Sequence, residues 1–245
     1  MRTPTMAYAV LALGGCANDA QLATPYDEVA QTIGAQLATS GGGGELTALT
    51  DATMVAHGAL PPSYVVKNDV VHATHDGIEY QYLVRCFDSS SRLLAECGGE
   101  AATAQVTAVW GGVIHMPRFE AALFQEASWR LHALDGAEAW VSGTGMASYY
   151  ATFGPSTHDA MYYEVTTEKQ ITLIWDPWAM QVRAGSQTAE ITAVQQQLAP
   201  AEHRTTELTG TIVFDHADRA TLTLDDRIYW IDSSSGDTTI ATELE

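Results

Sequence analysis

The stretch Ile78-Glu79-Tyr80-Gln81-Tyr82-Leu83-Val84-Arg85 alternates apolar and polar side chains over most of its length. Successive side chains of a β-strand point to opposite faces, so a period of two predicts a strand with one buried face and one face in water. The preceding His75-Asp76-Gly77 is typical of a tight turn, because Asp and Gly tolerate the backbone angles that such turns require. The stretch is therefore expected to form one arm of a β-hairpin.

Similar alternation continues after Pro61-Pro62, with clusters of turn-forming residues between the segments. Short connections between consecutive strands indicate antiparallel neighbours, and more than ten strands seldom stay in one flat sheet. The expected fold is mainly β: an antiparallel meander curled into a barrel or half-barrel, or folded into a sandwich, with an N-terminal amphipathic helix. The further strand segments are Ala104–Trp110, Trp129–Ala133, Trp140 and its neighbours, Tyr149–Phe153, Met161–Val165, Ile171–Trp175, Met180–Val182, Leu208–Phe214, Ala220–Leu224 and Arg227–Ile231.

Residues 24–38 follow a helical period instead. Apolar residues recur there every three or four positions, which predicts a helix with one apolar stripe, and the glycine-rich residues 40–44 end it. We expect the stripe to pack on the sheet, with a lid over a ligand cavity as the alternative. Residues 45–58 show only a weak helical period and remain ambiguous. The stripe consists of Tyr26, Val29, Ala30, Ile33 and Leu37.

Residues 1–15 have the layout of a secretory signal peptide. Arg2 supplies a positive charge, and Met6 to Leu13 form an apolar run that is too short to span a bilayer as a permanent helix. The small residues Gly14 and Gly15 suit a cleavage site. This arrangement predicts export of the remaining chain.

The motif Leu13-Gly14-Gly15-Cys16 resembles the lipobox of bacterial lipoproteins. The resemblance implies cleavage before Cys16, acylation of its thiol and new amine, a tether over residues 16–23, and effectively permanent anchoring by three acyl chains. Because Ala17 rather than Asp follows the cysteine, it also implies the outer membrane of a bacterial cell envelope, with the periplasmic or surface face left open. A plain secretory signal with an incidental cysteine is the alternative.

The remaining chain, residues 24–245, is expected to form one β-rich domain. Its Tyr26-Asp27-Glu28-Val29 helix start, glycine-rich gap and strand over residues 79–86 resemble predicted lipoproteins of bacteria to which no activity is attached. With 46% hydrophobic residues the chain is able to bury a core, and its formal charge of −19 repels nucleic-acid phosphates and anionic headgroups. We therefore expect no nucleic-acid partner.

Cys86 and Cys97 remain once the lipid cysteine is subtracted, and an exported protein meets oxidising surroundings. They flank a polar stretch between strand-like residues, which predicts a disulfide across a hairpin. A bridge that closes a loop of this size contributes roughly 2–3 kcal/mol through the unfolded state. A redox-active pair is the alternative, although a Cys-x-x-Cys spacing is lacking.

Catalytic and metal-binding motifs are hard to find in the sequence. His72 and His75 lie three positions apart and would face opposite sides of a strand, and the other histidines are dispersed. Asp225-Asp226 belongs to a predicted turn, and Ser142-Gly143-Thr144-Gly145 does not match a nucleophile elbow. We expect no catalytic residues, no metal site and no cofactor.

Aromatic residues are the remaining candidates for ligand binding. Exposed rings on a rigid sheet stack on sugars or hold apolar ligands, whereas rings between layers fill a core. The favoured function is a non-catalytic, lipid-anchored envelope protein with a structural or partner-binding role. The alternatives are a carrier or sensor of an apolar ligand in a curled-sheet cavity and a hydrolase, which would need an acid pair or a Ser/His/Asp cluster at one cleft. The candidate ligand-binding residues are Trp175, Trp178, Tyr149 and Tyr163.

Overall fold

The computed structural model describes residues 24–39, 43–116, 119–153, 161–198, 201–216 and 218–241. The predicted signal peptide, Cys16 and the tether lie outside these residues. The described chain starts with helices α1 (Tyr26–Leu37) and α2 (Glu45–Ala56), and neither of them has the length and apolarity needed to cross a bilayer. The strands that follow are β1 (Val65–Lys67), β2 (Val70–His75), β3 (Ile78–Phe87), β4 (Thr103–His115), β5 (Phe119–His132), β6 (Ala139–Phe153), β7 (Met161–Asp176), β8 (Gln181–Leu198), β9 (Ala201–Phe214), β10 (Arg219–Leu224), β11 (Arg227–Asp232) and β12 (Thr238–Ile240).

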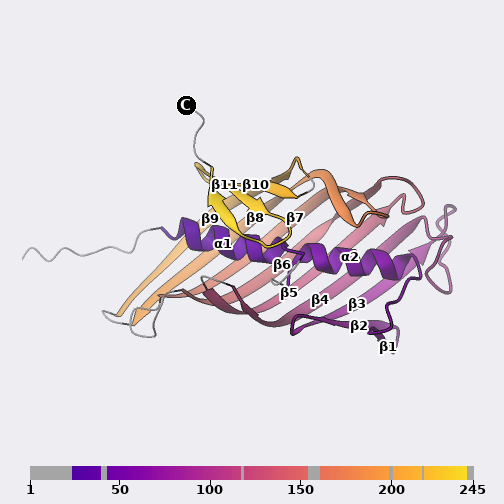
Figure 1. The fold of residues 1–245 in the computed structure, drawn as a ribbon, viewed down its shortest axis with the longest axis horizontal. Coiled ribbons are helices and arrows are strands. Elements are labelled where there is room, and N and C mark those ends of the chain that lie inside the picture. Colours follow the sequence, from indigo (N-terminus) through magenta and orange to yellow (C-terminus); the bar gives the residue numbers. More distant parts are fainter. Residues whose placement is uncertain are drawn as a thin grey trace, which may run out of the picture.

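All twelve strands belong to one antiparallel sheet, in which each strand pairs with the next one along the chain. The predicted meander is therefore confirmed. The sheet curls without closing, with β1 and β12 at its edges, so the half-barrel is the alternative that the structure adopts (Figure 1). Both helices lie against its inner face, and the opposite, outer face is convex.

Strict alternation explains the length of the central strands. In β5 buried and exposed residues alternate from Phe119 to His132 without interruption, and Leu123, Trp129 and Leu131 point inward. The predicted segment Trp129–Ala133 covers only the end of this strand. The inward side chains of the sheet join those of the helices in one hydrophobic core.

Strand β7 unites two segments that the sequence analysis separates, Met161–Val165 and Ile171–Trp175. The residues between them are polar, yet Thr167 and Lys169 point inward and are buried. The Thr167 hydroxyl donates to Gln36 on α1, and the Lys169 ammonium donates to Glu45 on α2. Polar partners on the helices therefore let the strand continue where its apolar pattern stops.

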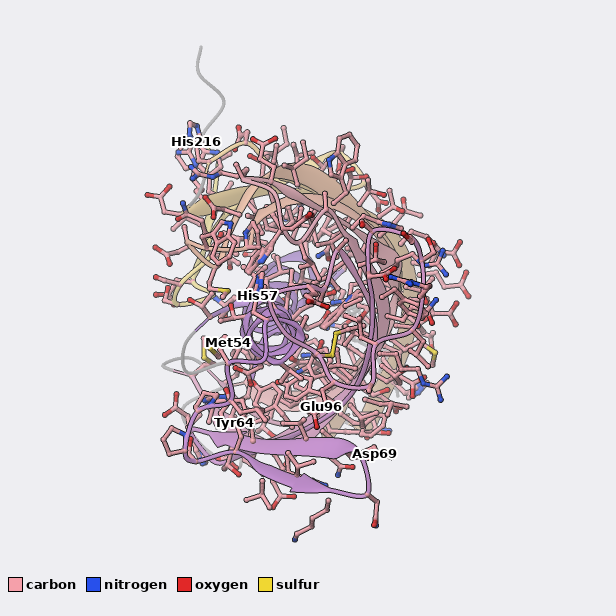
Figure 2. All side chains as sticks on the ribbon, turned by 90° about the vertical axis from the view of Figure 1, so that its right-hand side faces the viewer. Met54, His57, Tyr64, Asp69, Glu96 and His216 are labelled. Atoms are coloured by element: carbon pink, nitrogen blue, oxygen red, sulfur yellow. A yellow bond between two sulfur atoms is a disulfide. The ribbon has the colours of Figure 1, made fainter. Side chains whose placement is uncertain are left out.

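The two helices run end to end along the inside of the curl (Figures 1 and 2). Helix α1 lies inside the range predicted for it, but from Val29 to Leu37 nearly every residue is buried, not only the predicted stripe. The extra burial arises because β10–β12 also contact α1: Tyr229 on β11 donates to Asp27, and Gly34 lies against the backbone of Gly236. The helix is thus a core element enclosed by the sheet, and α2 resolves the ambiguous segment as helix.

Two tight turns join the first three strands of the sheet, and one of them is the turn predicted at His75-Asp76-Gly77. Asp76 and Gly77 join β2 to β3 with φ values of +49° and +84°, and Asn68 and Asp69 join β1 to β2 with φ values of +50° and +64°. Positive φ at both central residues defines a type I′ turn, whose twist matches that of paired strands. The hairpin predicted at His75-Asp76-Gly77 is confirmed.

The disulfide between Cys86 and Cys97 is present, with 5.3 Å between the two Cα atoms. The polar stretch between the cysteines does fold back, with an antiparallel bridge between Phe87 and Leu93, but Cys97 lies beyond this bridge rather than opposite Cys86. On the neighbouring strand β4, Ala104 lies opposite Cys86. Cys97 belongs to the long connection between β3 and β4, which also passes close to Gly58 behind α2. The bridge therefore fastens this connection to β3 near the end of α2.

A buried ion pair joins the helices to the middle of the sheet. The Nζ atom of Lys169 lies 2.9 Å from Oε2 of Glu45, and both side chains are only 3% exposed. The amide of Gln187 on β8 donates to the same oxygen over 3.3 Å. Removing one charge would leave the other without compensation in the core, which is costly, whereas removing both together is often nearly neutral.

We expect Lys169→Met to lower the free energy of unfolding by about 3–5 kcal/mol, because it leaves the Glu45 carboxylate buried and unpaired. The double variant Lys169→Met/Glu45→Leu should recover most of this loss. Chemical denaturation of both variants and the wild type measures the difference. Equal instability of the single and double variants would show that the ion pair is not the cause.

Candidate functional site

The outer face of the sheet is organised in rows that run across the strands. Arg85 on β3 lies opposite Gln105 on β4, Gln105 lies opposite Arg130 on β5, and Arg130 lies opposite Ser142 on β6. A parallel row two residues further along begins at Leu83. We call these two rows, from β3 to β8, the polar rows. They contain Arg85, Gln105, Arg130, Ser142, Thr172 and Ser186, and Leu83, Thr107, Ser128, Thr144, Gln170 and Thr188.

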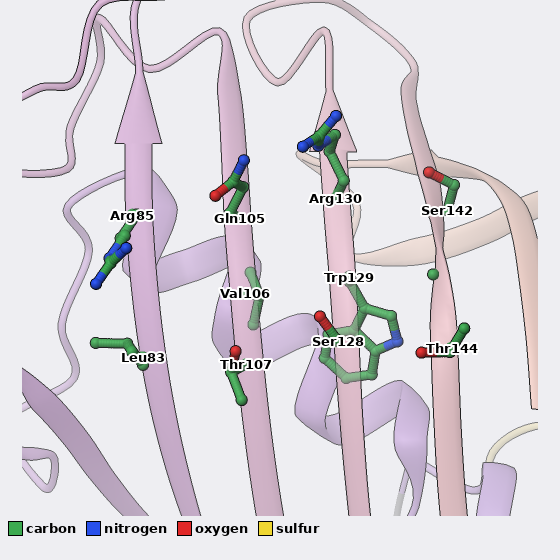
Figure 3. Close-up of a pocket in the computed structure, with 11 residues that line it drawn as sticks. Leu83, Arg85, Gln105, Val106, Thr107, Ser128, Trp129, Arg130, Ser142 and Thr144 are labelled. Carbon is green, nitrogen blue, oxygen red and sulfur yellow. The ribbon is translucent and has the colours of Figure 1, made fainter.

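A hollow of about 590 Å³ lies over the β3–β6 part of the polar rows (Figure 3). Its side chains are mostly short, such as Thr107, Ser128 and Thr144, while the two arginines stand at its border. A second hollow, of about 370 Å³, shares these three residues and extends to Gln170 on β7, with Glu126 and Glu168 also in its lining. Together the hollows form a shallow depression across neighbouring strands.

The charge of the polar rows differs from that of the whole chain. The protein carries 30 acidic residues and only 11 lysines and arginines, yet the polar rows contain two arginines and no acidic residue. In the described part of the chain no acidic side chain forms an ion pair with Arg85 or Arg130. Acids follow in the next row on one side, which includes Glu126, Glu168 and Glu190. The hollow of about 590 Å³ is therefore a locally positive area on an acidic protein, whereas Glu126 and Glu168 line the smaller hollow beside it.

A large exposed aromatic residue borders the polar rows. Trp140 on β6 lies opposite His132 and is 59% exposed. It points to the same face as Ser142, two residues along, because its neighbours Ala139 and Val141 are buried. An indole surface and hydrogen-bonding groups thus adjoin on one rigid sheet.

The four aromatic residues that the sequence singles out are not brought together at one site. Trp175, Tyr149 and Tyr163 point into the core, with exposures of 1%, 0% and 4%. Trp178 is exposed in the turn after β7, where its ring stacks on His57 with 4.8 Å between centroids and its indole N–H donates to the carbonyl of Gly136. Trp178 therefore ties this turn to the end of α2.

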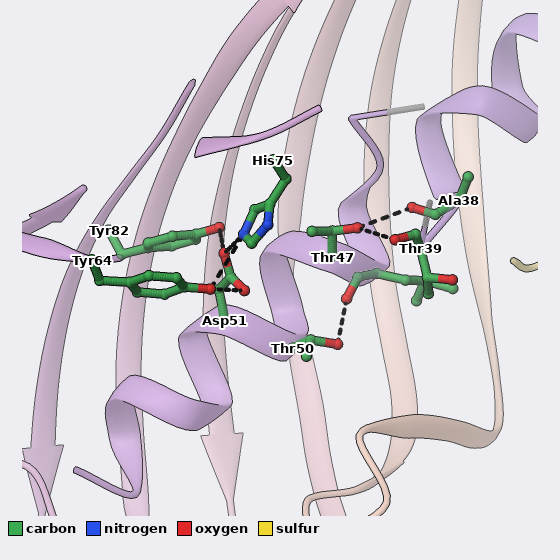
Figure 4. A network of polar contacts seen from close by, with 9 residues as sticks. Ala38, Thr39, Thr47, Thr50, Asp51, Tyr64, His75 and Tyr82 are labelled. Carbon is green, nitrogen blue, oxygen red and sulfur yellow. Dashed lines mark hydrogen bonds and ion pairs between the residues drawn. The ribbon is translucent and has the colours of Figure 1, made fainter. Parts of the chain in front are cut away.

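A cluster of polar side chains surrounds the buried carboxylate of Asp51 on α2 (Figure 4). Tyr64 donates to Oδ1 over 2.5 Å, Tyr82 donates to Oδ2 over 2.7 Å, and Nε2 of His75 lies 2.8 Å from Oδ2. Burial, followed by the nearby Asp51 carboxylate, raises the pKa of Tyr64 and of Tyr82 far above the usual range of tyrosine. The cluster connects α2 to β2, β3 and the segment before β1.

A surface hollow of about 570 Å³ opens beside this cluster, and Thr47, Thr50 and Ser63 contribute hydroxyls to its lining. Thr47 donates to the carbonyl of Thr39 and Thr50 to that of Leu46, so both hydroxyls serve the backbone. Among the described residues, no serine or cysteine hydrogen-bonds to His75. The cluster of Asp51, Tyr64, His75 and Tyr82 is therefore better explained as a structural clamp than as a nucleophilic site. We call it the clamp, because it holds α2 against the sheet.

The sequence analysis predicts a site neither at the polar rows nor at the cluster around Asp51. The sequence treats His75 only as a poor co-ligand of His72 and as part of a turn, whereas its side chain, 35% exposed, contacts Asp51, which belongs to the segment of ambiguous prediction. The polar rows have no local motif, because their members come from six strands and meet only through the register of the sheet. The one available signal is the alternation around Arg85 and Arg130, which places both arginines on the wet face.

We expect Asp51→Asn to lower the free energy of unfolding by about 2–3 kcal/mol, because an amide cannot accept all the hydrogen bonds of Tyr64, Tyr82 and His75. Asp69→Asn is the matched control: it makes the same chemical change in an exposed turn that tolerates asparagine, and should stay within about 0.5 kcal/mol of the wild type. Thermal or urea unfolding measures both. Equal effects of the two substitutions would contradict the clamp.

The tyrosines of the cluster predict loss of stability in alkali. A group whose pKa is higher in the folded than in the unfolded chain stabilises the fold below the unfolded value, about 10 for tyrosine, and this contribution disappears as the pH rises further. We expect the near-ultraviolet absorbance of the buried tyrosinates to appear only together with unfolding. Tyr82→Phe should weaken the alkaline part of the stability loss. Ionisation of all tyrosines near pH 10 without unfolding would refute the prediction.

Comparison with known proteins gives no relative for this chain. No protein-family model matches it, and neither a curated protein sequence nor a solved structure matches it. A function for the chain is therefore argued from its own residues, and the two places that carry chemistry are the polar rows of the outer face and the clamp around Asp51.

Proposed function

We propose that this protein is a non-catalytic, lipid-anchored protein of the bacterial cell envelope that binds a partner through the outer face of its sheet. The observation that carries the binding role is the hollow of about 590 Å³ over the polar rows, which combines hydrogen-bonding groups, local positive charge and an adjoining exposed tryptophan. Binding sites place a few polar groups in a hollow of a rigid scaffold. The twelve-stranded sheet provides such a scaffold.

The anchor is supported by the lipobox-like Leu13-Gly14-Gly15-Cys16 and by the apolar run before it. A Cys86–Cys97 disulfide fits an oxidising compartment outside the cytosol. Residues 16–23 would supply a short tether between the acylated cysteine and α1. The outer membrane is the proposed location, since Ala17 follows the cysteine.

The non-catalytic role is supported by how the reactive groups near Asp51 are used. The carboxylate accepts from two tyrosines and His75, and the hydroxyls of Thr47 and Thr50 bond to backbone carbonyls. Burial of α1 and α2 against the sheet favours partner binding over the carrier of an apolar ligand, because the helices occupy the inner face where such a ligand would lie.

Intact-mass measurement of the protein extracted from its native membrane tests the proposal. We expect a mass that corresponds to loss of residues 1–15, addition of acyl chains at Cys16, and loss of two hydrogens for the disulfide. The control variant Cys16→Ser should leave the membrane fraction while keeping its disulfide. An unmodified Cys16 in a soluble wild-type protein would refute the anchor.

A further inference from the structure

We infer that the polar rows bind a glycan through one carboxylated sugar, with Arg130 and Arg85 on the carboxylate side and Trp140 beside the sugar ring. The inference rests on the proposed function, because it names the ligand class for the same outer face. It draws on three features: the two arginines, the neutral hydrogen-bonding groups between and beyond them, and the exposed indole.

The arginines supply recognition of an acid. Two steps of about 4.8 Å between strands place the backbones of Arg85 and Arg130 about 10 Å apart, with Gln105 between them. Their long side chains border the same hollow (Figure 3). A guanidinium donates two parallel hydrogen bonds to a carboxylate, which gives both strength and orientation. With no acid of the described chain paired to them, both guanidinium groups are available to a ligand.

The remaining groups suit a neutral, hydroxyl-rich ligand. Ser128, Ser142, Thr107 and Thr144 carry hydroxyls that both donate and accept, and Gln105 carries an amide that does the same. Sugar hydroxyls need such two-way partners. The short side chains also leave the depression in which a sugar chain is able to lie across the strands.

Trp140 supplies a surface for the apolar face of a sugar ring. It is 59% exposed and lies on the same strand and face as Ser142, about 7 Å along the strand. A rigid indole loses little conformational entropy when it binds, so its exposed area favours contact with a ring. The path from Trp140 along β6 to Ser142, and then across to Arg130 on β5, therefore presents an indole, a hydroxyl and a guanidinium in this order.

The net charge limits the ligand to few acidic groups. A formal charge of −19 repels a polyanion at long range, whereas one carboxylate is attracted at short range by two arginines. The row with Glu126, Glu168 and Glu190 lies directly beside the polar rows and would oppose a second acid on that side. A mostly neutral glycan with a single acidic sugar fits this distribution.

The test compares two probes that differ in one group: a xylo-oligosaccharide bearing a single glucuronate, and the same oligosaccharide with that carboxylate reduced to an alcohol. Ligand-observed NMR titration of the full-length protein in detergent gives both affinities. We expect wild-type protein to prefer the acidic probe roughly tenfold or more, the range expected for a hydrogen bond to a charged group. Arg130→Gln together with Arg85→Gln should abolish this preference.

Two further variants separate the contributions. Trp140→Ala should weaken binding of both probes alike and leave their ratio unchanged. Arg92→Gln removes the same charge from an exposed loop next to Asp88 and should leave both affinities unchanged. Failure of the wild type to bind either probe, equal affinity for both, or an equal loss of preference in Arg92→Gln would overturn the inference. Acylation of Cys16 is measured separately by intact mass, so the test of the anchor is independent of the test of the sugar site.

Discussion

Covering the inner face of an open, curled sheet is the constraint on which the structure depends. A closed barrel buries its interior by itself, but a sheet with two free edges exposes a concave apolar face to water unless other elements fill it. Here α1 and α2 fill it, and β10–β12 contact α1 on a further side. The residues before the first strand are therefore part of the core rather than an addition to it.

The contacts between the helices and the sheet also determine where the helices lie along the sheet. Apolar packing alone tolerates small sliding of a helix, whereas Glu45 with Lys169, Gln36 with Thr167, and Asp51 with Tyr82 form only at one placement along the sheet. Polar groups in a core cost free energy to bury, and leaving one of them unpaired costs more. The paired groups thus disfavour alternative placements by leaving buried donors and acceptors unmatched.

The difference between patterns within one strand and contacts between distant residues explains what the sequence could and could not predict. Alternation such as that of residues 78–85 depends on one strand and one wet face, so strands, hairpins and the meander were predictable. Strand β7 was divided in the prediction because the partners of Thr167 and Lys169 lie more than a hundred residues away, on the helices. His75 and the pair Arg85 and Arg130 were missed as sites for the same reason: their neighbours are set by tertiary register, which leaves no local pattern.

The two faces of the sheet consequently carry different chemistry. On the inner face several polar groups, among them Thr167, Lys169 and Tyr82, bond to partners on the helices, so a substitution of one of them changes stability. On the outer face residues such as Ser142 and Thr144 have no such partner to satisfy, and the β-propensity of threonine explains many of them without any ligand. That explanation does not extend to the absence of acids from two rows of a strongly acidic chain, nor to two arginines that pair with no acid of the described residues and lie beside an exposed tryptophan. We therefore base the proposed binding role of this face on its charge pattern more than on its hydroxyls.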